Sequence, residues 1–234
     1  MVARPVAGGG RRVEVGPERL SRWIDGFAER HGPFSARVAD GRLVLTAADE
    51  AVAELAPPPG APVAAGGPVA AGGPVAASDE GDAGAAGDAR VAEFVAAASA
   101  PRRLGLLLVR RGGIAVGVAV GAELVSSKVD SAYVQSRTAA GGWSQQRFAR
   151  RRENQAKALT GDAADVAARL FAGERLDALV IGGDRALVDA VLADARLGGL
   201  PAPARHLDVS DPRLAVLKAA VAAARAVEVT LRDP

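Results

Sequence analysis

The residues whose types and spacing could do chemistry lie in one run, GGWSQQRFARRRENQ, at residues 141–155. The two glycines at its start can adopt positive φ angles and let a backbone approach a substrate closely. Two glutamines follow, Gln145 and Gln146. A glutamine amide does not titrate in the physiological range, so it cannot act as a general base, but it can orient a water molecule. The same run also fits a surface turn followed by Ser144 as a helix N-cap.

Basic residues follow this run at the spacing of one helix face. The positions at i, i+3, i+4 and i+7 of the predicted helix are Arg147, Arg150, Arg151 and Asn154. Phe148 and Leu159 mark the opposite side, which should face a core. From Lys128 to Lys157 the chain carries seven basic and two acidic residues, a net charge of +5, while the whole chain carries only +2. This segregation favours contact with a polyanion, and a solvated helix face is the alternative.

Other candidate sites are weaker. The chain has no cysteine, so disulfides, thiolate metal sites and cysteine nucleophiles are excluded, and His31 and His206 are its two imidazoles. We therefore predict no protein-built zinc site, no cofactor and no Ser-His-Asp triad. The segment 180–184, VIGGD, resembles a phosphate-binding turn but lacks the full glycine pattern, so a helix cap is the favoured interpretation.

Targeting signals are also missing from the sequence. Residues 1–10 contain no apolar signal-peptide region, and the longest apolar stretch, 104–125, is interrupted in the middle by two arginines and two glycines. We expect two strands and a turn there, no membrane contact and a cytoplasmic protein.

The sequence of the amino-terminal part predicts a disordered tail at 1–10, a small α+β unit at 11–55 and a low-complexity linker at 56–89. Within the unit, a helix is expected over 18–30, and two strands at 35–38 and 42–46 flank an Asp40-Gly41 turn. The unit is too small to bury a core alone, so it should pack on the main domain. The linker contains almost only Ala, Gly, Pro and Val, a composition typical of disorder.

Residues 90–234 predict a mixed α/β domain, ribonuclease H-like in outline, in which antiparallel strands precede alternating helices and strands. The expected strands are 104–109, 114–120, 124–129, 133–136, 178–181 and 206–209. The expected helices are 90–98, 146–159, 163–171, 184–195 and 211–226. Gly161 should stop one helix and Asp162 should cap the next. The strand at 114–120 alternates Ile and Val with Ala and Gly, which predicts a half-buried strand whose small face lets a helix pack closely.

The run at 141–155, with YVQSR just before it, resembles the actinobacterial branch of the VLRF-type release factors. That family is related to the VMS/ANKZF-type enzymes, which release peptides from stalled large ribosomal subunits, and to the central domain of eukaryotic and archaeal class-1 release factors. The resemblance covers most of 11–55 and 91–234. It implies a peptidyl-tRNA hydrolase whose glycine-rich loop reaches the peptidyl-transferase centre.

The family's glycine-x-serine/threonine-glutamine pattern places the functional glutamine at Gln145. Trp143 and Ser144 separate it from Gly142, unlike the Gly-Gly-Gln of ordinary release factors, so Gln146 is the alternative. The implied catalytic residues are Gly141, Gly142, Ser144 and Gln145. The candidate RNA-binding residues are Arg137, Trp143, Gln146, Arg147, Arg150, Arg151, Arg152 and Lys157. Trp143 could stack on a base or be a buried anchor.

The expected partners are the large ribosomal subunit, its RNA and peptidyl-tRNA, and not DNA. No second domain is large enough to read a stop codon, so we predict ribosome rescue without codon recognition. Two alternatives stay open. The domain could cut a phosphodiester at the tRNA 3′ end, or it could be a non-catalytic module that docks on the ribosome or on tRNA.

Overall fold

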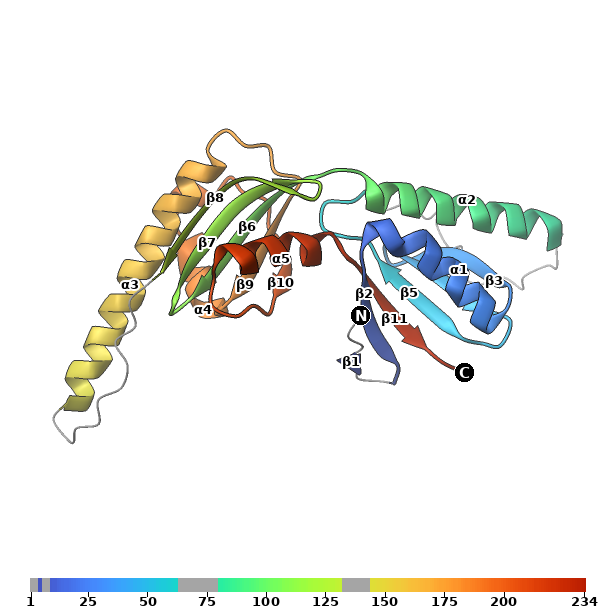
Figure 1. Cartoon of the computed structure of the whole chain (residues 1–234), viewed down its shortest axis with the longest axis horizontal. Helices are drawn as coiled ribbons and strands as arrows, with labels where there is room; N and C mark the ends of the chain where they lie inside the picture. Colours follow the sequence, from blue (N-terminus) through green and yellow to red (C-terminus); the bar gives the residue numbers. More distant parts are fainter. Residues whose placement is uncertain (1–3, 6–8, 63–79, 132–143) are drawn as a thin grey trace. The chain divides into compact units, whose positions relative to one another are not determined.

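The computed structural model describes the backbone of residues 4–5, 9–62, 80–131 and 144–234, and all of their side chains except those of residues 4, 80–86, 144–149 and 151–152. The chain divides into two compact units (Figure 1). The first comprises Met1–Ala100 and Arg225–Pro234, and the second comprises Pro101–Ala224. The mixed α/β class predicted from the sequence is confirmed.

The first unit is an antiparallel sheet packed against two α-helices. Its strands follow the order β1-β2-β11-β5-β4-β3. They are β1 (Arg4–Pro5), β2 (Arg11–Val15), β3 (Phe34–Ala39), β4 (Arg42–Ala47), β5 (Val52–Ala56) and β11 (Val227–Arg232). The helices are η1 (Pro17–Arg19), α1 (Leu20–His31) and α2 (Glu80–Ser99). One buried cluster, which includes Phe27 of α1 and Phe94 of α2, joins these helices to the sheet.

Two elements of this unit form as their local sequence predicts. Leu20, Ile24 and Phe27 are buried on one face of α1, as their i, i+4, i+7 spacing requires. Asp40 and Gly41 join β3 to β4, with φ angles of 48° and 70°. Positive φ at both central residues matches the right-handed twist of a two-residue hairpin, so the predicted Asp-Gly turn is confirmed.

The predicted limits of the first unit are wrong in two places. Strand β11 pairs with β2 and β5 in the interior of the first sheet, although the sequence assigned the chain end to the second domain. Helix α2 begins at Glu80, within the predicted linker 56–89, and Pro58 and Pro59 of that linker are buried. Residues 11–55 do not bury a core alone, as predicted, because α2 and β11 from outside that range complete the core of the first unit.

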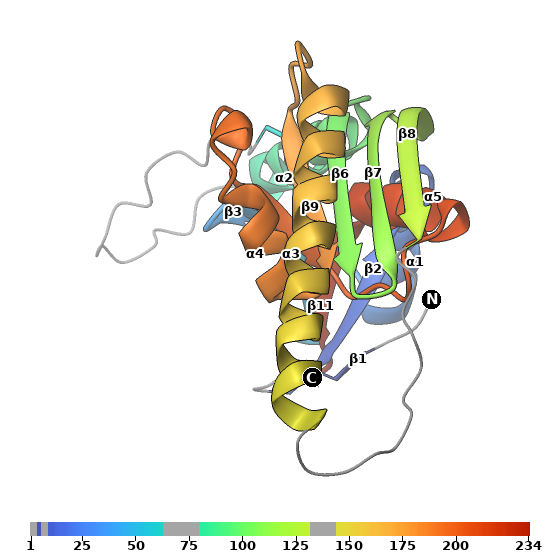
Figure 2. The ribbon, with the colours of Figure 1, turned by 90° about the vertical axis from the view of Figure 1, so that its left-hand side faces the viewer.

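The second unit is a mixed sheet with helices on both faces (Figure 2). The strand order is β10-β9-β6-β7-β8, antiparallel from β6 to β8 and parallel from β6 to β10. The strands are β6 (Arg103–Arg110), β7 (Gly113–Val120), β8 (Glu123–Ser131), β9 (Ala178–Gly183) and β10 (Pro203–Leu207). The helices are α3 (Ser144–Phe171), α4 (Arg185–Leu192), η2 (Ala195–Leu197) and α5 (Leu214–Arg225). The strand predicted at 133–136 lies outside the described residues.

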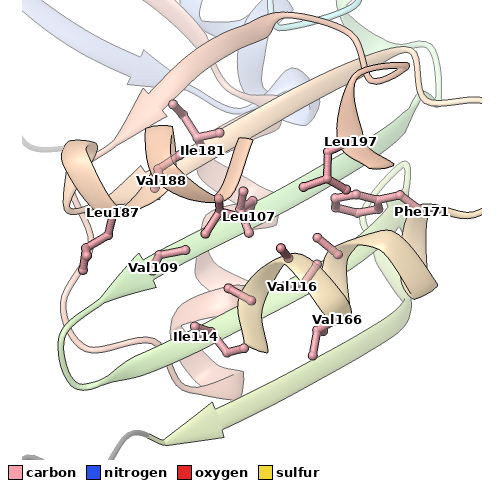
Figure 3. Close-up of a cluster of buried hydrophobic side chains, with 14 of the residues drawn as sticks. Leu107, Val109, Ile114, Val116, Val166, Phe171, Ile181, Leu187, Val188 and Leu197 are labelled. Atoms are coloured by element: carbon pink, nitrogen blue, oxygen red, sulfur yellow. The ribbon is translucent and has the colours of Figure 1, made fainter. Parts of the chain in front are cut away.

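The two faces of this sheet carry different side chains. Ile114, Val116 and Val118 of β7 belong to the cluster under α3 and α4, part of which is drawn in Figure 3. On the other face the small residues of β7 lie against α5, and a Cβ on Gly117 would come within 3.1 Å of Leu217 Cδ2. The small face therefore permits close helix packing, as predicted. The prediction that β7 is half-buried is wrong, because helices cover both faces and Val120 is the strand's only partly exposed residue.

Helix α3 is continuous through the predicted break. It runs from Ser144 to Phe171 without stopping at Gly161, and Asp162 is an exposed residue within it. A glycine inside a helix costs about 1 kcal/mol relative to alanine. The apolar stripe that includes Leu159 and Ala163 is buried on both sides of this position, and that burial is worth more than the cost of one glycine.

Candidate RNA-facing site on helix α3

The first half of α3 extends past the sheet that holds its second half. The ring of Phe171 would lie 3.4 Å from a Cβ on Gly105, near the start of β6. From Gly105 to the end of β6 at Arg110 is ~17 Å of strand, which a helix covers in about 11 residues. Helix α3 therefore passes the carboxyl edge of β6 near residue 160. The preceding segment, residues 144–159, therefore reaches ~20 Å beyond the sheet. Figures 1 and 2 show this part of α3 extending past the strands.

Burial along α3 agrees with this geometry. Leu159 is buried, as predicted, and Ala156 is partly buried against the same core. Before Ala156, every residue of α3 whose side chain is described is exposed: Arg150, Glu153, Asn154 and Gln155. Lys157 is exposed as well. The projecting half of α3 thus presents polar side chains over its described part, and its apolar residues gather where the sheet begins.

The candidate catalytic residues lie at the tip of this projection or just before it. Ser144 is the first helical residue, so Gln145 and Gln146 both belong to the first turn of α3. The sequence analysis predicted that this helix begins at Gln146, one residue after the key glutamine. That predicted boundary is wrong, because the helix begins at Ser144. Side chains are not described for Ser144, Gln145, Gln146, Arg147, Phe148, Arg151 and Arg152. Arg137, Gly141, Gly142 and Trp143 lie outside the described residues altogether.

The start of α3 has the chemistry of a helix amino terminus. The first four N–H groups of a helix have no acceptor within it, and the helix dipole places partial positive charge there. In α3 these groups include those of residues 144–146. Such an end can donate hydrogen bonds to a phosphate or to a developing oxyanion.

The charges near this edge fall into paired and unpaired groups. Lys128 and Asp130 of β8 form an exposed ion pair with a 4.0 Å separation. Arg150 and Lys157 are exposed, and neither forms an ion pair with any described side chain. The same holds for Arg185, the first residue of α4, which the sequence analysis did not select. Unpaired, solvated cations are available to an anionic partner.

The turn from β9 to α4 is a helix cap, as predicted. The carboxylate of Asp184 accepts hydrogen bonds from the backbone N–H groups of Ala186 and Leu187, at 3.1 and 3.3 Å. Gly183 has a φ angle of +95° and leads the chain from β9 into this cap. The glycine-aspartate pair is therefore explained by the start of α4.

Comparison with protein families decides the relationship that the sequence of residues 141–155 suggested. The model of the family described as the actinobacterial and chloroflexi VLRF1 release factors matches residues 102–230. The chain belongs to this VLRF1 release factor family. No curated protein matched the chain.

The VLRF1 match covers particular parts of the structure. It runs from the start of β6 through α3 and α5 into β11. Residues 11–55, to which the sequence resemblance also extended, lie outside the matched range. In this VLRF1 chain β11 belongs to the sheet of the first unit, so the matched segment supplies a central strand to a unit that is otherwise outside the match.

Other chemistry is not assembled around α3 in the described part of this VLRF1 protein. His31 lies in the first unit, where its Nδ1 is 2.9 Å from Asp49 Oδ2, and His206 lies on β10 of the second unit. Hydrogen bonds from His31 and from the Ala51 N–H hold the pKa of Asp49 below its usual value. The described residues include no group of three or more His, Asp or Glu side chains suited to a metal ion. None of the described helices has the length and apolar character needed to span a bilayer.

Proposed function

We propose that this protein hydrolyses the ester bond of peptidyl-tRNA on stalled large ribosomal subunits. Membership of a release factor family supports a role in translation. The observation that carries the finer proposal is the position of Gln145, in the first turn of a helix whose exposed half projects ~20 Å from its domain. A projection of this length, one helix wide, suits entry into a narrow cavity lined by RNA.

The proposed chemistry is positioning rather than acid-base catalysis by the protein. The Gln145 amide orients one water molecule toward the carbonyl carbon of the ester. The water oxygen forms the new bond to that carbon, the bond to the ribose oxygen breaks, and the ribose oxygen takes up a proton. Because the amide does not titrate, the proton transfers belong to the tRNA ribose and to water. Positioning lowers such a barrier by up to roughly 7 to 11 kcal/mol.

Neighbouring residues have supporting roles in this proposal. Gly141, Gly142 and Ser144 shape the approach of the loop to the ester, and a backbone N–H of the first helical turn stabilises the oxyanion by about 3 kcal/mol. The proposed RNA contacts are Arg137, Trp143, Gln146, Arg147, Arg150, Arg151, Arg152 and Lys157. Contacts to phosphates give affinity without sequence preference, which suits a factor that must act on any tRNA. The corresponding partners are ribosomal RNA and peptidyl-tRNA in the cytoplasm, with no cofactor.

The test uses isolated large subunits that carry peptidyl-tRNA labelled in both the peptide and the tRNA. Ester hydrolysis releases free peptide together with tRNA that keeps an intact 3′ CCA end. A shortened tRNA 3′ end with the peptide still attached to the fragment would replace the proposal with phosphodiester cleavage. Binding without release of either label would make the protein a docking module.

A further inference from the structure

Helix α3 passes the edge of the second sheet at which α4 starts. Gly183, which precedes α4, pairs with Val109 near the carboxyl end of β6. Helix α3 passes that edge near residue 160, and both helices contribute to one buried cluster on the same face. Each is followed by a strand of the parallel part of the sheet, so the two helices run in the same direction. The first turn of α4 therefore lies near residue 160 of α3, about one helical turn from Lys157.

An ion pair shows which side of α3 faces α4. Asp165 Oδ1 of α3 is 2.8 Å from Arg196 Nη1, in the η2 turn that follows α4. At ~100° per residue, Asn154 lies about 20°, Arg150 about 60° and Lys157 about 80° from the direction of Asp165 around the helix axis. The exposed basic stripe of α3 is thus on the side that also meets the α4 and η2 segment.

Arg185 extends this stripe onto the neighbouring helix. It is exposed in the first turn of α4, where the helix dipole disfavours a positive charge. The dipole of α4 therefore gives no folding reason for the arginine. Packed helices have axes ~8–10 Å apart, so Arg185 and Lys157 extend from neighbouring helices.

Acidic residues on this side leave the cations available. Glu153 of α3 and Asp189 of α4 are exposed, and neither forms an ion pair with any side chain that the structure describes. The carboxylate of Asp184 is engaged by the N–H groups of α4. The turn from β6 to β7 differs, because there the carboxylate of Asp211 lies beside Gly112, the residue after Arg111. The basic surface therefore follows the α3 and α4 side of the edge.

We infer that Arg185 forms, with Lys157 and Arg150, a phosphate-binding track that holds the sugar-phosphate backbone of an RNA strand across the exposed part of α3 and the start of α4. This inference rests on the proposed function, in that it extends the RNA surface of α3 to a residue outside that helix. Arg185 supplies binding energy away from the ester and takes no part in the chemistry.

Binding of the full-length protein to tRNA and to isolated large subunits tests the inference, measured over a range of salt concentrations. Arg185→Gln should weaken binding several-fold and lower the log-log salt slope by about one unit. Arg185→Lys should keep the slope because it keeps the charge. Arg175→Gln is the matched control, since Arg175 is exposed in the turn between α3 and β9, at the opposite edge. The thermal unfolding midpoint of Arg185→Gln should equal or exceed that of the wild type.

Three results would overturn the inference: an unchanged salt slope in Arg185→Gln, an equal loss in Arg175→Gln, or a loss on subunits with none on protein-free tRNA or ribosomal RNA. The last result would mean that the track binds an acidic surface of a ribosomal protein and not RNA. Single-turnover hydrolysis at saturating protein separates this test from the proposed function. A wild-type protein that binds RNA through Arg185 but releases no peptide would refute the proposed function and leave this inference standing.

Discussion

Asp165 of α3 and Arg196 of η2 form a 2.8 Å ion pair, and Arg196 also bonds the carboxylate of Asp194 at 2.8 Å. Arg196 thereby links the segment after α4 to the second half of α3. The arginine side chain, together with the backbone N–H of Arg196, lowers the pKa of Asp194 to about 2. All three side chains are at least partly exposed, so we expect the linkage to orient the segment more than to stabilise the fold.

The first prediction concerns this carboxylate. Its pKa in the folded protein is lower than its ordinary value of 3.8, so its contribution to stability is complete above about pH 4 and is lost as the pH falls toward 2. Arg196→Gln should raise the pKa of Asp194 toward 3.8, as followed by NMR titration of the side-chain carboxyl carbon. Glu174 provides an internal reference signal in the same spectra. An Asp194 pKa that stays near 2 in the variant would show that Arg196 is not the cause.

The second prediction concerns the continuity of α3. Gly161→Ala should stabilise the protein by about 1 kcal/mol in urea unfolding, because a Cβ there meets nothing within 4 Å and alanine favours a helix. Gly117→Ala is the opposite control, since its Cβ would lie 2.8 Å from Leu124 Cδ1 and 3.1 Å from the Ser126 carbonyl oxygen. Loss of stability in Gly161→Ala would indicate that α3 breaks at this residue.

The third prediction concerns the Ala, Gly and Pro segment. Replacing residues 63–79 with a glycine-serine linker of equal length should leave the thermal midpoint and the hydrolytic activity nearly unchanged, because that segment has no large apolar side chain. Removing residues 63–90 instead should lower the thermal midpoint by several degrees, since that deletion includes the first half of α2. Equal midpoints for the two variants would mean that the start of α2 contributes nothing to the first unit.

The fourth prediction concerns the basic stripe of α3. Changing Arg147, Arg150 and Arg151 together to glutamine should weaken binding to large subunits and flatten its salt dependence by roughly one unit of log-log slope per lost contact. The exposed Arg169, near the far end of the same helix, offers a control that should leave the slope unchanged. If affinity and slope are both retained in the triple variant, these arginines are only solvated and the RNA-facing surface lies elsewhere.

Local signals explain what the sequence could predict. The Asp40-Gly41 turn, the apolar face of α1 and the Asp184 cap each depend on residues a few positions apart, and each is present as expected. Strand β11 was missed because its partners are far away in the sequence. Val229 pairs with Leu55 and Val13, and no sequence pattern within residues 227–232 indicates that pairing.

The start and length of α3 also could not be predicted from local signals. Gly161 and Asp162 are genuine stop and start signals, yet burial of the apolar stripe across them keeps the helix intact. The position of Gln145 in the first helical turn also needed the structure, since the glycines before it favoured a loop. Arg185 carried one visible signal, a basic residue directly after an N-cap aspartate, that local reasoning passed over.

The fifth prediction addresses the central claim, that Gln145 acts in the transition state. Gln145→Ala should slow single-turnover hydrolysis of peptidyl-tRNA on large subunits by at least about 100-fold, some 2.7 kcal/mol, while ribosome affinity stays within a few-fold of the wild type. Gln146→Ala is the matched control, one position later in the same helical turn, and should have a milder effect.

The single most direct measurement is therefore the hydrolysis rate of Gln145→Ala beside that of Gln146→Ala, with both proteins at saturating concentration on the same preparation of subunits. The account predicts a large loss of rate in the first variant and a smaller one in the second. Full activity in Gln145→Ala with loss in Gln146→Ala would move the role by one residue. Full activity in both variants would contradict the glutamine mechanism itself.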